Sequence, residues 1–445
     1  MKKKTTIMIF MKRILIVAAI VMSALSAGAK TYTLSECVDI ALSNNISLQQ
    51  QRGTYEMQRL QYAQSKHNLL PSLSGNVGQN FSFGRATGAD NVTVSQNMAN
   101  TSFGLSANLL LFDGLGMKYR IDVARAQAEA SEQDTRKQEA DIRMNIATMF
   151  LQILLNKELL QVADTQLEAS RLKVERAEQL VSEGRLAEGE LYTLQAQYAR
   201  DELSQTEASN RLQLSLLDLA QAMDIEFGAD FDIAAPTELT NLTEILPSND
   251  EVYETAVRNR PEVRAARLQL QAQQSALKSA KSAYSPSLSA GANFGTGYYH
   301  RFGASNTAFG TQLSDNLSTT VGLNLSIPIF DRMQTPNSVK RQQIQVENQL
   351  LQIERVKQTL RKEIDQAYFN ALAAGKQQKS AAKAEQSLRE AYRYAEQKFE
   401  AGRATSYEYY DAKNNYVKAL SDALQAKYNY LFRLRILKYY MGADI

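Results

Sequence analysis

The 445-residue chain has one cysteine and two histidines, and both scarcities exclude classes of site. Cys37 has no second cysteine with which to form an intramolecular disulfide. His67 and His300 are far apart in the sequence, and no cluster of residues has the spacing of metal ligands. We also find no phosphate-binding loop, no Ser/His/Asp signature and no pair of carboxylates placed for catalysis. The sequence therefore predicts no catalytic residue, no cofactor and no metal site.

Proline is also scarce, and its few positions leave long gaps. The seven prolines lie at positions 71, 236, 247, 261, 286, 328 and 336. Residues 72–235 and 337–445 therefore contain none, and proline is the residue that most strongly breaks a helix interior. The hydrophobic share of 44% and the charged share of 22% are those of a globular protein. The proline-free stretches can thus hold very long helices.

Residues 1–29 have the features of a secretory signal peptide. An apolar run at 14–25 precedes an Ala-Gly-Ala cleavage site at 27–29, and five cations come before the run: Lys2, Lys3, Lys4, Lys12 and Arg13. The alternative, a transmembrane anchor, needs ~20 apolar residues. Cleavage before Lys30 leaves 45 Lys and Arg against 47 Asp and Glu, a formal net charge of −2. This balance argues against a nucleic-acid partner.

Cys37 lies in the segment YTLSECVDIAL, where Leu34, Val38 and Leu42 mark one apolar helix face. A lipidated cysteine is the alternative, but Glu36 immediately before it does not suit a lipidation site. We therefore predict that Cys37 is a buried small side chain.

Four blocks of the sequence occur twice in the same order. The pairs are CVDIALSNNISL (37–48) with VYETAVRNRPEV (252–263), LLPSLSGNV (69–77) with YSPSLSAGA (284–292), FGLSANLLLFDG (103–114) with VGLNLSIPIFDR (321–332), and SEGRLAEGELY (182–192) with EAGRATSYEYY (400–410). Matched order at a nearly constant offset indicates an internal duplication. We predict two repeats, residues 30–230 and 250–445, joined by a connector at 231–249.

Both repeats follow the same predicted plan. A helix ends near a proline, two strand-like segments follow, and then a very long helix leads through a glycine-containing turn into another helix. The predicted helices cover 35–69, 115–182 and 190–223 in the first repeat and 250–283, 337–401 and 407–441 in the second. The fold class is therefore mainly α with a small β part.

The strand-like segments, about 71–83, 102–112, 286–300 and 317–330, alternate apolar residues with Ser, Asn and Gly. Each is long enough for the ~9–11 residues that a tilted strand needs to cross a bilayer. An apolar outer face and a polar inner face are typical of transmembrane barrel strands. The alternative is a soluble, half-buried hairpin.

Four strands cannot close a barrel, and an open sheet edge in lipid leaves unsatisfied backbone groups. Two chains would supply eight strands and a filled lumen, whereas three would supply twelve and leave a passage. We therefore predict a homotrimer with a shared 12-stranded barrel. The loops at 84–101 and 303–316 are polar and would lie outside the cell.

The long helices carry apolar residues at alternating spacings of three and four, which predicts packing against neighbouring helices. At ~1.5 Å per residue each would form a rod of about 100 Å. We expect long antiparallel helical hairpins that form a coiled-coil tunnel. A solid bundle, serving as a non-conducting periplasmic coiled-coil scaffold of the envelope, is the alternative.

The repeated motifs together resemble the TolC-like outer-membrane efflux protein family. They are TLSECVDIALSNN, the Pro-Ser-Leu strand starts, the strand ends LLLFDG and IPIFDR, and FEAGRATSYEYYDA at 399–412. The resemblance implies a trimeric channel in the outer membrane of a Gram-negative bacterium, with a long periplasmic part. It also implies docking to a periplasmic adaptor and an inner-membrane pump. The channel would conduct the substrates of the pump passively and would catalyse no reaction.

The resemblance also implies functional residues at two tip turns, about 183–189 and 400–406. Those expected to dock the adaptor are Gly184, Arg185, Leu186, Gly402 and Arg403. Those expected to gate the entrance are Glu190, Glu408 and Asp411. The alternative for each charged residue is a solvated charge at a helix end.

This sequence departs from the family pattern near the second turn. Ala404 stands where the family carries an arginine, and Phe399 stands where it carries a tyrosine. Thr193 in the first repeat takes the place of the acidic residue seen at Asp411. These departures concern the network of contacts that would hold the entrance closed.

Overall fold

The computed structural model describes residues 30–87, 93–95, 97–228, 230–234 and 246–442. The predicted signal peptide lies outside these residues, as does most of the predicted connector. The chain divides into two compact units. We call the first, which contains Arg136–Arg260 and Gln358–Ile445 together with the chain up to Gln51, the helical unit. The second, Arg52–Thr135 with Pro261–Lys357, is the sheet unit.

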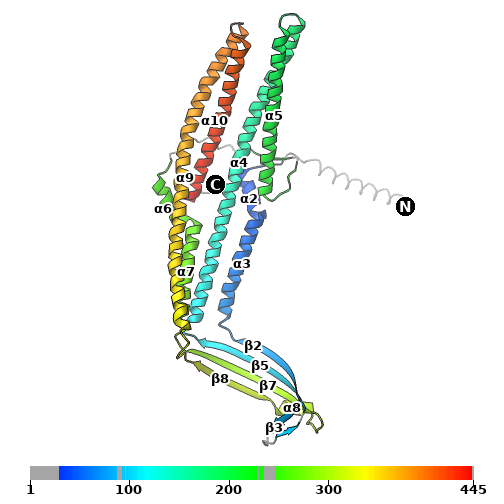
Figure 1. Ribbon diagram of the computed structural model, residues 1–445, viewed down its shortest axis with the longest axis vertical. Helices are drawn as coiled ribbons and strands as arrows, with labels where there is room; N and C mark the ends of the chain where they lie inside the picture. Colours follow the sequence, from blue (N-terminus) through cyan, green and yellow to red (C-terminus); the bar gives the residue numbers. More distant parts are fainter. Residues whose placement is uncertain (1–29, 88–92, 96, 229, 235–245, 443–445) are drawn as a thin grey trace, which may run out of the picture. The chain divides into compact units, whose positions relative to one another are not determined.

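The sheet unit contains one four-stranded antiparallel sheet (Figure 1). Its order is β2 (Ser72–Ser82), β5 (Met98–Phe112), β7 (Ser287–Arg301) and β8 (Ser318–Ser326). The four strands therefore form where the alternation predicts them, and the two hairpins join at β5 and β7. β8 is shorter than predicted because Pro328, just beyond it, has no N–H to donate.

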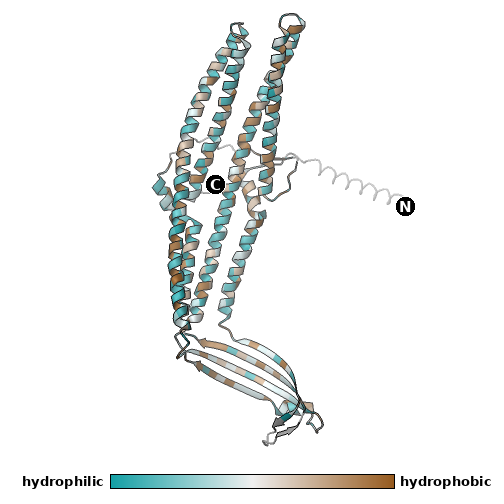
Figure 2. Ribbon diagram, in the orientation of Figure 1, coloured by the Kyte–Doolittle hydropathy of each residue, from teal (hydrophilic) through white to brown (hydrophobic). Residues whose placement is uncertain are grey.

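Hydropathy alternates along the strands of the sheet, as the bands in Figure 2 show, so its two faces differ in character. One face carries large apolar residues that are mostly exposed, among them Leu73 (75%), Val77 (71%), Val321 (77%) and Leu323 (71%). The other face is polar, and there the hydroxyl oxygens of Ser74 and Ser106 lie 2.8 Å apart. A soluble half-buried hairpin would cover its apolar face, whereas most of this face is uncovered within the described chain.

The interiors of the longest helices lie in the proline-free stretches, and Pro336 lies in the first turn of α9, where a proline is tolerated. α4 (Gly116–Ser182) and α9 (Gln334–Glu400) each contain 67 residues. Each is followed by one more long helix, α5 (Glu188–Ala222) or α10 (Ser406–Met441). The two helical hairpins, α4 with α5 and α9 with α10, therefore form as the sequence predicts, and we call them the two hairpins below.

The other predicted helices, 35–69 and 250–283, are each broken into two. The first consists of α2 (Leu34–Asn44) and α3 (Ile46–His67), and the second of α6 (Asn249–Asn259) and α7 (Pro261–Ser282). Asn45 interrupts the first, and its side-chain oxygen accepts from the backbone N–H of Leu48 at 3.0 Å, as a cap does. Pro261 interrupts the second because it has no N–H and suits only a first helical turn.

Several short elements were not predicted. β1 (Lys30–Tyr32) pairs in parallel with β6 (Phe231–Ile233), and β3 (Arg85–Thr87) pairs with β4 (Thr93–Ser95). The short helix α8 (Phe309–Asp315) lies in the predicted 303–316 loop. Three to seven residues are too few to show a hydrophobic period.

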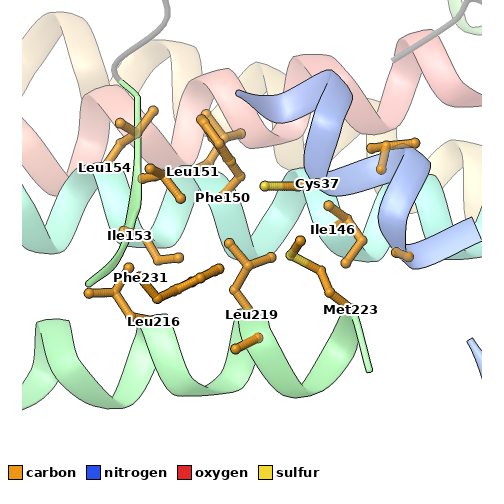
Figure 3. Packing of buried hydrophobic residues seen from close by; sticks show 14 of the residues in the cluster. Cys37, Ile146, Phe150, Leu151, Ile153, Leu154, Leu216, Leu219, Met223 and Phe231 are labelled. Atoms are coloured by element: carbon orange, nitrogen blue, oxygen red, sulfur yellow. The ribbon is translucent and has the colours of Figure 1, made fainter. Parts of the chain in front are cut away.

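The main apolar core of the helical unit joins α2, α4, α5 and β6 (Figure 3). Cys37 and Ile153 are fully buried in it, and Phe150 is 1% exposed, so the predicted burial of Cys37 is confirmed. Burial raises the pKa of the Cys37 thiol to about 12, which makes the thiol unreactive. α4 is long and apolar enough by composition to cross a membrane, but many of its apolar side chains pack in this core.

A buried arginine ties three helices of the helical unit together. Arg260, between α6 and α7, is only 5% exposed. Its Nη2 donates to the hydroxyl of Tyr439 at 2.7 Å, and its guanidinium lies 4.0 Å from the centre of that ring. The Tyr439 hydroxyl donates in turn to Asp141 of α4. The break before Pro261 thus places a cation where α10 and α4 meet.

We expect Arg260→Met to lower the free energy of unfolding by about 2 kcal/mol, because a buried hydrogen bond from a charged group is lost. Chemical denaturation of the detergent-solubilised protein, followed by circular dichroism, measures the change. Arg267→Met, on the exposed side of α7, is the control and should change the value by less than about 0.5 kcal/mol. Equal losses in the two variants would contradict the role assigned to Arg260.

Candidate functional site

The first predicted tip is a tight, fully hydrogen-bonded end of helix α4. Gly184 has a φ of 69°, in the left-handed region that favours glycine. The N–H of Gly184 donates to the carbonyl of Val181, and the N–H of Arg185 donates to the carbonyl of Leu180, both at 2.9 Å. These two bonds define a Schellman motif, which ends the helix and reverses the chain.

The second tip is built in the same way. Gly402 has a φ of 66°, and its N–H donates to the carbonyl of Phe399 at 3.0 Å. The N–H of Arg403 donates to the carbonyl of Lys398 at 2.8 Å. Both predicted glycines therefore lie where only a residue that tolerates positive φ fits without strain.

Glu408, a predicted gate residue, caps helix α10. Its Oε2 accepts from the backbone N–H of Thr405 at 2.8 Å and from the Thr405 hydroxyl at 3.0 Å. The same hydroxyl accepts from the backbone N–H of Glu408 at 3.2 Å. The bond from the Thr405 backbone holds the pKa of Glu408 below its ordinary value. The motif T-x-x-E at 405–408 is the sequence signature of this capping box.

The other two predicted gate residues have different surroundings. Glu190, near the start of α5, accepts from the Ser406 hydroxyl of α10 at 2.7 Å, so it links the two hairpins. Asp411 is exposed and accepts from the Asn415 side chain, one turn further along α10, at 3.1 Å. The structure therefore brings Glu190 to the start of α10 and leaves Asp411 on an open helix face.

The predicted docking residues lie on the outside of the two turns. Arg185 and Arg403 are exposed, and Arg185 forms an ion pair with Glu183 at 3.1 Å. Leu186 is half-buried. Such exposed pairs contribute little to stability, so these side chains are available to a partner.

Below the tips, a buried polar cluster joins the two hairpins. Tyr409 of α10 is 1% exposed, and its hydroxyl accepts from Lys173 of α4 and lies 3.0 Å from the hydroxyl of Tyr392. One turn further along α10, Lys413 is 4% exposed and pairs with Asp201 of α5 at 3.5 Å. Lys173 and Tyr409 are 236 positions apart, and no short motif connects them, so sequence reasoning missed this cluster.

The cluster disfavours the charge on Lys173. Burial lowers the pKa of Lys173 to about 8, and the nearby ammonium group of Lys413 adds to this shift. The carboxylates of Glu396, Glu400 and Asp201 oppose it more weakly. At neutral pH the ammonium group of Lys173 is therefore less stable between the two hairpins than it would be in water.

We expect Gly402→Ala to destabilise the second tip by about 1 kcal/mol, since an alanine must adopt a left-handed φ there. A Cβ at this position meets nothing within 4 Å, so the backbone alone sets the penalty. Gly189→Ala is the matched control, because Gly189 lies in α5 without a positive φ and with equally open surroundings. It should be neutral or stabilising in the same denaturation assay. A penalty of similar size at both positions would argue against the strained turn.

Lys173→Met should stabilise the packing of the hairpins at pH 7 by about 1 kcal/mol, because it removes a poorly solvated charge while losing one hydrogen bond. A lowered lysine pKa means that the native state gains stability as pH rises from about 8 towards 10.5. The advantage of the variant should therefore disappear by pH 10.5. Guanidinium midpoints at pH 7 and pH 10.5 measure this, with exposed Lys376→Met as the control. A difference in midpoint between the variant and the wild type that is the same at both pH values would contradict the lowered pKa of Lys173.

Comparison with known proteins identifies the family. The family profile described as outer membrane efflux protein matches residues 37–223 and 252–443. The chain therefore belongs to the outer membrane efflux protein family, as the resemblance predicted. It is an efflux transport protein of the outer membrane of a Gram-negative bacterium, and its family and fold are those of outer-membrane channels.

Individual relatives are distant in sequence but close in fold. The outer membrane efflux protein BepC of Brucella suis biovar 1 (strain 1330) is 22% identical over 372 residues, which cover 81% of this chain and 75% of the relative. The CmeC outer membrane channel of Campylobacter jejuni superposes with a TM-score of 0.77 at 19% identity, over 92% of this chain and 85% of that one. The open state of the Neisseria gonorrhoeae MtrE outer membrane channel gives 0.74 at 19% identity, over 92% and 89%.

Proposed function

We propose that this protein is the exit duct of a tripartite efflux or type I secretion system. It conducts substrates passively from a periplasmic adaptor and an inner-membrane pump to the exterior. The observation that carries this proposal is the sheet of β2, β5, β7 and β8, which has an exposed apolar face and two unpaired edges. Such a sheet fits lipid on one side and water on the other.

The unpaired edges require other copies of the chain. In lipid, each unsatisfied backbone group costs several kcal/mol, so β8 of one copy must pair with β2 of the next. Three copies give a 12-stranded barrel with an open lumen, whereas two would give a filled one. The polar face, with Ser74 and Ser106, then lines the passage.

The duplication explains how each copy contributes to the tunnel. We assign the first repeat to residues 30–230 and the second to 250–445. In each repeat a broken helix leads into the sheet, and a 67-residue helix leaves it and turns back at a glycine. Two such hairpins per copy supply the wall of a helical tunnel in the periplasm.

The tips are the proposed docking and gating site. Gly184, Arg185 and Leu186 form one contact for the adaptor, and Gly402 with Arg403 forms the other. The bond between Glu190 and Ser406 holds the two hairpins of one copy together. In a trimer, Glu408 and Asp411 place six carboxylates around one entrance, which attracts cations and repels further negative charge.

Single-channel recording in planar bilayers tests both the duct and its gate. Because Glu408 also caps α10, the informative variant is the double amide Glu408→Gln with Asp411→Asn, which keeps the cap and removes the charge. We expect a higher conductance and weaker block by multivalent cations. Glu347→Gln, at an exposed position of α9, is the control and should behave as the wild type.

The outcomes separate the two parts of the proposal. An assembled wild-type protein that does not conduct would overturn the duct and support a non-conducting scaffold. A conducting protein whose double amide variant shows unchanged block would overturn only the gate.

A further inference from the structure

The four strands of the sheet carry almost no charge. All of their residues are described, and Arg301 is the only one with a formal charge at neutral pH. Most other residues on the polar face of these strands are Ser, Thr, Asn or Gly. A single cation in an otherwise neutral wall dominates the local electrostatic potential.

The register assigns Arg301 to the polar face. Side chains alternate along β7, so Arg301 shares a face with Tyr299, Gly297 and Gly295. Its partner on β5 is Met98, and Tyr299 pairs with Asn100. The nearest position to Arg301 on this face of β7 is Tyr299, and the two positions beyond it, Gly297 and Gly295, carry no side chain.

Chain connectivity places Arg301 at one end of the barrel. β7 begins at Ser287, shortly after helix α7 ends at Ser282, and it ends at Arg301. Arg301 therefore lies at the end of the strand farther from the helices. In the proposed assembly the helices are periplasmic, so this end is the outer mouth.

The backbone of Arg301 is clamped. The side-chain oxygen of Asn306 accepts from the Arg301 N–H at 2.7 Å, and the Asn306 side-chain N–H donates to the Arg301 carbonyl at 3.0 Å. The next residue, Phe302, donates its N–H to the carbonyl of Asn97 at 3.0 Å. The base of the side chain is thus held in place although it lies at the end of a strand.

Among the described residues, no carboxylate forms an ion pair with the exposed Arg301 guanidinium. The nearest acidic residue along the described chain is Asp315 of helix α8. That helix packs on the opposite face of the sheet. There the ring centres of Phe309 and Tyr298 lie 5.1 Å apart, and the Leu313 carbonyl accepts from the Thr296 hydroxyl at 2.7 Å. Within the part of the chain that the structure describes, the positive charge is therefore not neutralised on its own face.

We infer that Arg301, repeated in every copy, forms a ring of positive charge at the outer mouth of the shared barrel and makes the exit select for anionic and neutral solutes. This inference rests on the proposed channel. The ring acts over roughly 8–10 Å at physiological salt. It thus affects solutes at the exit.

Reversal potentials in a potassium chloride gradient across planar bilayers test the ring. Arg301→Gln should lower the ratio of chloride to potassium permeability roughly two-fold, and Arg301→Glu should lower it further. His300→Arg is the matched control, because it adds a cation at the adjacent position on the opposite face. It should leave the ratio unchanged.

Chemical modification provides an independent measurement on a folded channel. In the Arg301→Cys variant, a methanethiosulfonate reagent bearing an ammonium group should restore the wild-type ratio, and one bearing a sulfonate should lower it below that of Arg301→Gln. The native Cys37 is fully buried and does not react. Channels that conduct with the same ratio in all variants would overturn the ring and leave the channel intact. Assembled wild-type protein without conductance would overturn the channel itself, and the ring with it.

Discussion

The hydrogen bonds missing at the edges of β2 and β8 are the constraint on which the rest of the assembly depends. Within one chain, the sheet satisfies its inner strands and leaves both edges open. Water can satisfy such edges, but lipid cannot. The exposed apolar face, with Leu73 and Val321, excludes water as the surroundings of that side. In the proposed assembly, the molecule meets both requirements at once by pairing its edges with those of further copies.

The helices form all their interior backbone hydrogen bonds within themselves, so they can be as long as an assembly that extends into the periplasm needs. α4 and α9 run for 67 residues without proline interrupting their interiors, and each ends at a glycine with positive φ. Their interiors then need only side-chain packing, which the core around Phe150 and Ile153 supplies for α4 and the clusters with Ala371 and Ala374 supply for α9. In the proposed assembly, the same chain uses inter-chain hydrogen bonds in the membrane and side-chain packing outside it.

Local patterns in the sequence determine most of the fold, and contacts distant in sequence determine most of the candidate site. The four strands follow from period-two alternation, and the glycines of the tips follow from their place between two helices. The break at Asn45 was missed because an asparagine in a helical pattern is only weakly unfavourable. The cluster of Lys173, Tyr409 and Asp201 was missed because its members come from three helices. Each of them alone reads as an ordinary surface or core residue.

The distribution of charge along the chain follows from the same difference between strands in lipid and helices in water. Strands that face lipid on one side can carry charge only on the other side, and there nearly every position is Ser, Thr, Asn or Gly. Helices exposed to water carry many charges, and some of these pair within one turn, as Arg171 does with Glu168 and Glu175. The backbone of Arg301 is clamped by Asn306, and among the described residues no carboxylate forms an ion pair with its guanidinium, so its field acts at the end of the strand.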